Sequence, residues 1–129
     1  MSILVRIAAM CVRIFGAIAL VLGIIFFFVS SLADNNTVLL IHEFSGVMIV
    51  LAVIILGSVQ AMRGGSSGLA AGAIVLGIAA YFFGRYQANI LPQNGHWIIE
   101  ILHLGIGIAL IALGEISGAK YKKLQAKSA

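Results

Sequence analysis

Five histidine and glutamate side chains stand inside long apolar stretches of this sequence, where charged groups are expected to be rare. They are His42, Glu43, Glu100, His103 and Glu115. A charge in apolar surroundings is costly, so such residues are functional candidates. Neutral imidazole is a common ligand of metal ions and haem iron, and a carboxyl group in such a place is expected to be protonated or paired with a cation. These five residues are therefore the candidates for chemistry.

The two histidines are predicted to lie at a similar depth on two different helices. His42 precedes Arg63 by 21 residues, and His103 precedes Lys120 and Lys123 by 17 and 20 residues. At 1.5 Å per helical residue these separations are about 31 Å and about 26–30 Å. If the two helices face each other, both imidazoles reach one central object.

A glycine follows each histidine by four residues: His42 is followed by Gly46, and His103 by Gly107. Residues i and i+4 share a helix face, so each glycine leaves a flat slot beside its histidine. A porphyrin needs such slots on both sides, and two neutral imidazoles are suitable axial ligands for its iron. Further glycines are spaced i, i+7 and would admit the edge of the ring or close helix packing: Gly16 and Gly23, Gly77 and Gly84.

Other interpretations of these residues remain open. The histidines would also serve interhelical hydrogen bonding in a purely structural bundle. Glu100 and His103 have the Glu-x-x-His spacing of di-iron bundles, but His42 and Glu43 are adjacent, which disfavours a two-metal site. A single Zn or Fe site from His42, Glu100 and His103 is a further alternative. Glu43 and Glu100 are candidates for proton relay to a quinone or a haem propionate, or for a structural role.

The composition predicts that lipid, not water, surrounds most of the chain. Of 129 residues, 62% are hydrophobic and 9% are charged, and the mean hydropathy is +1.16. Soluble domains carry about 25% charged residues. The single cysteine, Cys11, excludes an internal disulfide and a c-type haem attachment. A basic patch with interleaved aromatic residues, as nucleic-acid binding would require, is missing from the sequence.

Four apolar runs predict an all-α integral membrane four-helix bundle that forms a single domain over residues 1–129. Polar breaks bound the expected spans at about 7–32, 38–62, 67–86 and 97–116. About 20 residues cross the hydrocarbon core as a helix, and a β-barrel would need alternating patterns that are missing. Ser31, Leu32 and Ala33 are similar to a signal-peptide cleavage site, but we expect this segment to be retained as the first span.

Charge predicts the orientation of the bundle. Only Arg85 and Asp34 fall on one side of a four-span arrangement, whereas seven cations fall on the other: Arg6, Arg13, Arg63, Lys120, Lys122, Lys123 and Lys127. This asymmetry predicts a multi-pass protein of the cell membrane with the N and C termini cytoplasmic. The basic C-terminal segment is expected to contact anionic lipid, and Glu115 is expected to pair with its lysines.

A weak internal repeat indicates that the first and second helical hairpins are similar. Residues 16–24 and 72–78 share a Gly-Ala-Ile segment and a Val-Leu-Gly-Ile segment, with two residues deleted from the second copy.

The four-span layout with a His-x-x-x-Gly segment in the second and fourth spans resembles the small membrane-bound b-type cytochromes. The resemblance implies one haem b with His42 and His103 as axial ligands of the iron, and with Gly46 and Gly107 beside the ring. It also implies that Arg85 and His96 meet the haem propionates near the outer face, with Tyr86, Asn94 and Trp97 as neighbours. His96 would alternatively be an interfacial residue.

The expected function is therefore electron transfer, as a b-type cytochrome or as the haem-bearing membrane subunit of an electron-transfer complex. A carrier or an oxidoreductase subunit is favoured over a stand-alone enzyme. The expected partners are the lipid bilayer, a quinone, and a larger membrane complex or further copies of this chain, with no nucleic acid. The alternatives are a cofactor-free accessory subunit and a bundle that handles metal ions or protons.

Overall fold

A computed structural model describes residues 2–91 and 95–127, except for the side chain of Ala88. These residues form four α-helices: α1 (Ile3–Phe28), α2 (Asn36–Met62), α3 (Ser67–Tyr86) and α4 (His96–Lys127). Two short 3-10 helices, η1 (Ser30–Leu32) and η2 (Gln87–Asn89), follow α1 and α3. All four α-helices are long and apolar enough to cross a membrane. The prediction of an all-α four-helix fold is confirmed, and the four apolar helices indicate a multi-pass membrane protein.

The polar breaks in the sequence supply the helix N-caps. The Asn35 side chain accepts hydrogen bonds from the first free backbone N–H groups of α2, at 3.0 and 3.2 Å, and Ser66 does the same for α3 at 3.3 Å. The helices differ from the apolar runs at their ends. α1 stops at Phe28, before two serines that favour turns, and α4 runs on to Lys127 through good helix formers.

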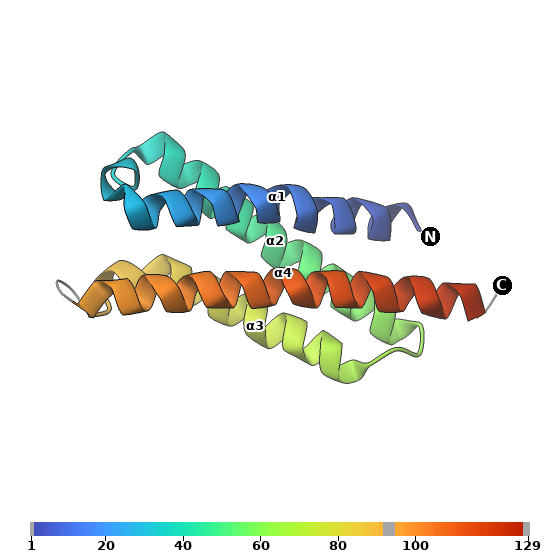
Figure 1. Cartoon of the computed structure of the whole chain (residues 1–129). Coiled ribbons are helices and arrows are strands. Elements are labelled where there is room, and N and C mark those ends of the chain that lie inside the picture. Colours follow the sequence, from blue (N-terminus) through green and yellow to red (C-terminus); the bar gives the residue numbers. More distant parts are fainter. Residues whose placement is uncertain (1, 92–94, 128–129) are drawn as a thin grey trace.

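α2 and α4 form the centre of the bundle. Each of these two helices packs against all three of the others. α1 and α3 lie on opposite sides of this central pair (Figure 1). Both termini and the turn between α2 and α3 lie at one end of the bundle (Figure 1), so the seven cations of the predicted cytoplasmic side gather toward that end. We call it the basic end, and the opposite end, with η1 and η2, the distal end.

A buried glutamine holds the turn between α2 and α3. The Gln60 side chain is fully buried. Its amide nitrogen donates to the carbonyl oxygens of Gly57 at 3.0 Å and Ser66 at 2.6 Å, and its oxygen accepts from the Ser66 N–H at 2.9 Å. The turn between them contains Gly64 with a φ of +77°, a conformation that glycine adopts without strain. This network fixes where α3 starts relative to α2.

The apolar core lies mainly in the half of the bundle nearer the basic end. Two glycines allow close helix approach there: a Cβ on Gly114 would lie 2.9 Å from Val53, and one on Gly57 would lie 2.8 Å from Ala73. In the distal half, taken as described residues 17–44, 78–91 and 96–109, Ile99 is the one buried apolar side chain. The distal half is therefore packed less tightly than the other. The buried apolar side chains of the whole described chain are Val5, Ala8, Val12, Ile49, Ala52, Val53, Leu56, Ala73, Ile99, Leu110 and Tyr121.

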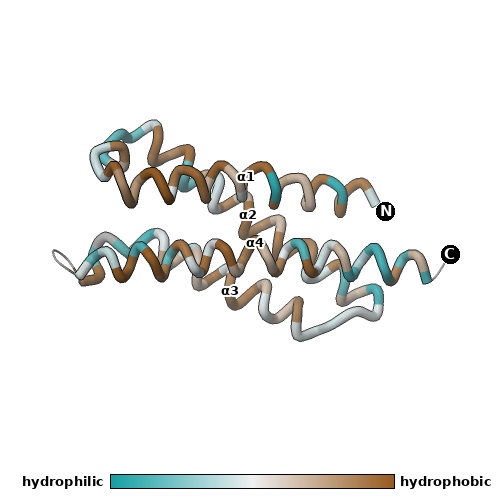
Figure 2. The backbone as a smooth tube through the Cα atoms, in the orientation of Figure 1, coloured by the Kyte–Doolittle hydropathy of each residue, from teal (hydrophilic) through white to brown (hydrophobic). Residues whose placement is uncertain are grey.

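The outside of the bundle is apolar, as a lipid-facing surface requires. Large side chains such as Ile14, Phe82 and Ile108 are half exposed on three different helices. Apolar colouring dominates the middle of the helices in Figure 2, and hydrophilic colouring is concentrated near the helix ends. Soluble monomers rarely expose such continuous apolar surface.

Candidate functional site

The two candidate histidines meet between the central helices. The ring centroids of His42 on α2 and His103 on α4 are 6.1 Å apart, with an angle of 61° between the ring planes. His42 lies six residues after Asn36, where α2 begins, and His103 lies seven residues after His96, where α4 begins. At 1.5 Å per residue the pair is therefore about 10 Å from the distal helix ends. The predicted common depth of the two imidazoles is present in the structure.

A glycine on a flanking helix lies next to each imidazole. A Cβ on Gly23 of α1 would lie 3.5 Å from Cε1 of His42, and a Cβ on Gly84 of α3 would lie 3.0 Å from Cε1 of His103. Each ring therefore lies close to the backbone of its neighbouring helix, because no side chain intervenes. Of the two glycine pairs spaced by seven residues, Gly23 and Gly84 face the histidines, whereas Gly16 and Gly77 serve helix packing.

Aromatic side chains enclose the histidine pair from the flanking helices. Phe26 of α1 meets His42 edge-on at a centroid distance of 5.3 Å. Phe83 of α3 stacks on His103 at 6.0 Å, with the planes only 11° apart. These contacts restrict how the two imidazoles can turn, and they keep the surroundings of the pair apolar.

Both imidazoles keep unused hydrogen-bonding capacity. Nδ1 of His42 and Nδ1 of His103 are buried and have no hydrogen-bond partner within the described part of the chain. The backbone of Ala19 lies within hydrogen-bonding reach of the His42 ring. A buried polar atom without a partner costs about 1–3 kcal/mol, so a pair of such atoms at one place favours a site that a ligand completes.

The spacing of the two rings fits ligation of one metal ion. When two imidazoles bind one ion from opposite sides through metal–nitrogen bonds of about 2.0 Å, their ring centres are roughly 6 Å apart. The observed 6.1 Å agrees with that value. Gly46 and Gly107 border open space, since a Cβ at either position would meet no atom within 4 Å.

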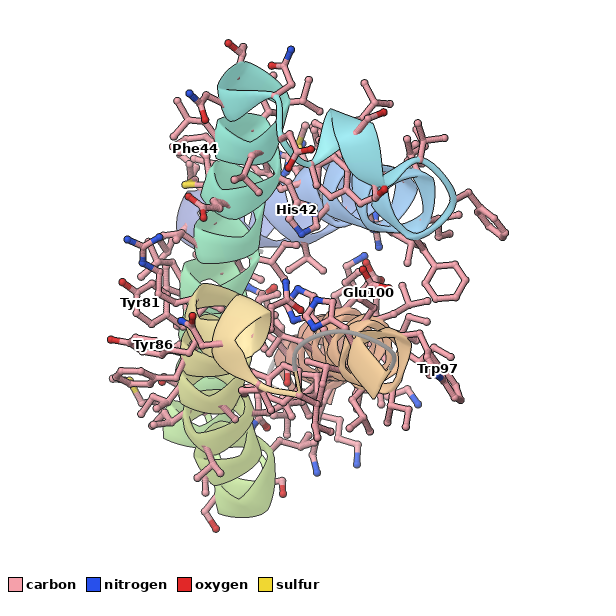
Figure 3. The ribbon with its side chains drawn as sticks, turned by 90° about the vertical axis from the view of Figure 1, so that its left-hand side faces the viewer. His42, Phe44, Tyr81, Tyr86, Trp97 and Glu100 are labelled. Carbon is pink, nitrogen blue, oxygen red and sulfur yellow. The ribbon has the colours of Figure 1, made fainter. Side chains whose placement is uncertain are left out.

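Figure 3 shows the site from the distal end. His42 and Glu100 lie toward the middle of the bundle, and Glu100 points into the space between α1 and α4. Phe44, Tyr81, Tyr86 and Trp97 lie at the periphery. The described residues contain no group of three or more metal-binding side chains. The alternative of a metal site formed by His42, Glu100 and His103 is therefore not present.

The predicted propionate partners lie outside the histidine pair. Arg85 Nη1 is 3.7 Å from a Glu43 carboxylate oxygen, and this ion pair between α3 and α2 is largely exposed. His96 Nδ1 is 3.4 Å from the carbonyl oxygen of Ile90, in the connection before α4. Tyr86 stacks on Phe82 at the surface, and Asn94 lies outside the described residues. Arg85 thus already has a carboxylate partner, and His96 makes a local contact.

The prediction for Glu115 is only partly right, because its hydrogen-bond partner is Arg13 and Lys122 contributes a weaker electrostatic attraction. Its two carboxylate oxygens accept hydrogen bonds from Nε and Nη2 of Arg13 at 2.8 and 2.9 Å. Arg13 lies 102 residues earlier in the chain. The antiparallel packing of α1 on α4 brings the two residues together, and the C-terminal lysines lie farther along α4, past the level of this pair.

The contacts around the histidines reveal a repeat of 61 residues in a register different from the predicted one. The predicted register pairs Gly23 with Gly77, whereas Gly23 and Gly84 hold equivalent places beside the two histidines. One histidine pair and four glycine pairs are separated by 61 positions: His42 and His103, Gly16 and Gly77, Gly23 and Gly84, Gly46 and Gly107, Gly57 and Gly118. The α1–α2 hairpin and the α3–α4 hairpin therefore each contribute one half of the site. A search for identical histidine and glycine spacings would have found this signal.

Comparison with known proteins gives no match: no family model, no curated protein and no solved structure is similar to this chain.

Proposed function

We propose that this protein is a membrane b-type cytochrome that holds one haem b between His42 and His103. The observation that carries the proposal is the pair of imidazoles with centroids 6.1 Å apart, one from each half of the 61-residue repeat. Further support comes from the open space at Gly46 and Gly107 and from the imidazole nitrogens that have no partner within the described residues.

The residues of the chain have separate tasks in this proposal. His42 and His103 hold the iron, while Gly23 and Gly84 let the rings lie against the neighbouring backbones. Phe26 and Phe83 hold the rings in place and keep water away. A bound haem b would supply one-electron transfer.

The position of the pair favours electron exchange at the distal face. The histidines are about two helical turns from that end. The basic end lies on the cytoplasmic side in this proposal, because positive residues are retained there during insertion. The protein would then reside in the cell membrane and exchange electrons with quinol or with a partner protein near the outer face. Glu100, which points inward near the pair, is the candidate proton acceptor.

The test is the visible absorption spectrum of the full-length protein, purified in detergent after expression with sufficient haem. We expect reduced-minus-oxidised Soret and α bands typical of a six-coordinate low-spin haem. His42→Ala and His103→Ala should each abolish this spectrum while the protein still inserts into the membrane. His96→Ala is the matched control, because this third histidine does not contact the pair.

Two results would contradict the proposal. A colourless wild-type protein that also fails to bind added haem would favour the cofactor-free accessory subunit. An unchanged spectrum in both histidine variants would mean that the haem is held elsewhere.

A further inference from the structure

A groove between α1 and α4 opens on the surface near the basic end. It has a volume of about 80 Å³, and its floor consists mostly of small residues. Because a water molecule occupies about 30 Å³ in the liquid, the groove has room for a group of phosphate size. Its lining residues are Val5, Ala9, Arg13, Gly114, Glu115, Gly118, Ala119 and Lys122.

The ion pair between Arg13 and Glu115 sets the register of the two helices. α1 and α4 are antiparallel, as Figure 1 shows. Arg6 precedes Arg13 by seven residues, and Lys122 follows Glu115 by seven. Residues seven apart share a helix face and lie about 10 Å apart along the axis. Arg6 on α1 and Lys122 on α4 are therefore at the same level, toward the basic end; Lys122 lines the groove, and Arg6 is next in sequence to Val5 of the lining.

Two cations at the same level beside a groove favour an anion between them. Two cations, Arg13 and Lys122, and one carboxylate, Glu115, line the groove, and Arg6 adds a third cation next to Val5 of the lining. That carboxylate is occupied by its two hydrogen bonds to Arg13. The other acids of the sequence are near the distal end. Asp34 just precedes α2, and Glu43 and Glu100 lie a few residues after the starts of α2 and α4. The groove therefore has an excess of positive charge that the chain does not compensate.

Apolar side chains near Arg6 indicate what the anion is attached to. Ile3 and Met10 are 75% and 58% exposed at the same end of α1, and they adjoin Arg6 on the outer face of that helix. The hydrophilic bands on α1 and α4 in Figure 2 border directly on apolar segments. A free inorganic anion would gain nothing from this apolar surface, whereas acyl chains would bury it.

We propose that the groove binds the phosphate group of an anionic phospholipid, with Arg6 and Lys122 as the cations that recognise it. The small side chains of Ala9 and Ala119 give the phosphate access to the space between the helices. The acyl chains then lie along the exposed apolar residues of α1. This site is at the opposite end of the bundle from the histidine pair and is independent of haem.

The test measures which lipid stays bound to the full-length protein. Protein in detergent is mixed with equal amounts of phosphatidylglycerol and phosphatidylcholine, and retained lipid is counted by native mass spectrometry. The wild type should prefer phosphatidylglycerol. Arg6→Gln with Lys122→Gln should reduce that preference roughly 25-fold, since each basic residue near anionic lipid contributes about fivefold. Lys123→Gln with Lys127→Gln is the matched control, because it removes the same charge from the same end and should leave most of the preference.

A second pair of variants tests the groove without changing charge. Ala119→Leu fills the groove and should lower phosphatidylglycerol retention, whereas Ala112→Leu, also on the exposed surface of α4, should not. If both double charge variants lose the phosphatidylglycerol preference equally, the attraction is diffuse and the proposal is overturned. A wild type that shows no preference for phosphatidylglycerol would also overturn it. Displacement of the lipid by excess inorganic phosphate would overturn the assignment to a lipid.

Discussion

Replacement of Gly84 by alanine should disturb the histidine site through a single added methyl group. The new Cβ would lie 3.0 Å from Cε1 of His103, whereas carbon atoms prefer separations of about 3.5–4.0 Å. The imidazole must therefore move away from α3 by about half an ångström or more. Phe83, stacked on the same ring, restricts the directions in which it can move.

The cost of such overpacking is about 1–3 kcal/mol. In the haem-free protein the His103 ring relieves part of this strain by shifting in the directions that Phe83 leaves open. A ring that also ligated iron would be held in place. The strain therefore falls mainly on the bound state, and haem affinity should drop by roughly 5- to 150-fold. The assay is titration of haem into the purified full-length protein, followed by the Soret band.

The structure provides two graded controls for this experiment. Gly77→Ala, on the same helix as Gly84, places a Cβ 3.1 Å from Val50 of α2, away from the histidines. It should lower thermal stability but leave haem affinity unchanged. Gly23→Ala places a Cβ 3.5 Å from His42, an ordinary contact, and should have little effect. If Gly84→Ala binds haem as tightly as the wild type, or if Gly77→Ala weakens binding equally, the position assigned to the ligand is refuted.

Three further predictions concern the rest of the bundle. Arg13→Leu alone or Glu115→Leu alone should lower the thermal unfolding temperature in detergent more than the two replacements together, because each single change leaves one charge without its partner. A double variant that is as unstable as the single variants would contradict this. Gln60→Leu should destabilise the fold by about 1–3 kcal/mol, because it removes three hydrogen bonds at the turn between α2 and α3; unfolding at an unchanged temperature would show that the network is dispensable. Asn35→Cys in a Cys11→Ser background should react with a membrane-impermeant thiol reagent added to intact cells, since the distal end is predicted to face outward; labelling only after cell lysis would reverse the proposed orientation.

Much of the fold is predictable from the sequence because membrane insertion depends on simple properties. Four apolar runs of sufficient length and polar breaks between them determine the number of helices. The same breaks contain the capping residues Asn35 and Ser66, so helix starts follow from local sequence. The common depth of His42 and His103 follows from counting residues along straight helices, and the structure places the two rings together.

The neighbours of the histidines are harder to predict, because they depend on how each helix is rotated and shifted against the next. The sequence pattern drew attention to Gly46 and Gly107 on the histidine-bearing helices. The glycines in contact with the imidazoles, Gly23 and Gly84, are on other helices. The pairing of Glu115 with Arg13 has the same origin, since nearby lysines in the sequence are separated from Glu115 along the helix axis.

The 61-residue repeat explains why one central object suits this bundle better than two separate sites. Each hairpin contributes an equivalent histidine, and the imidazoles of His42 and His103 meet between α2 and α4. The identity is kept at the histidines and glycines that shape this central space. It is lost at the acids, because the positions equivalent to Glu43 and Glu100 are Leu104 and Leu39. The two proposed ligands are therefore alike, while their acidic neighbours differ between the two hairpins.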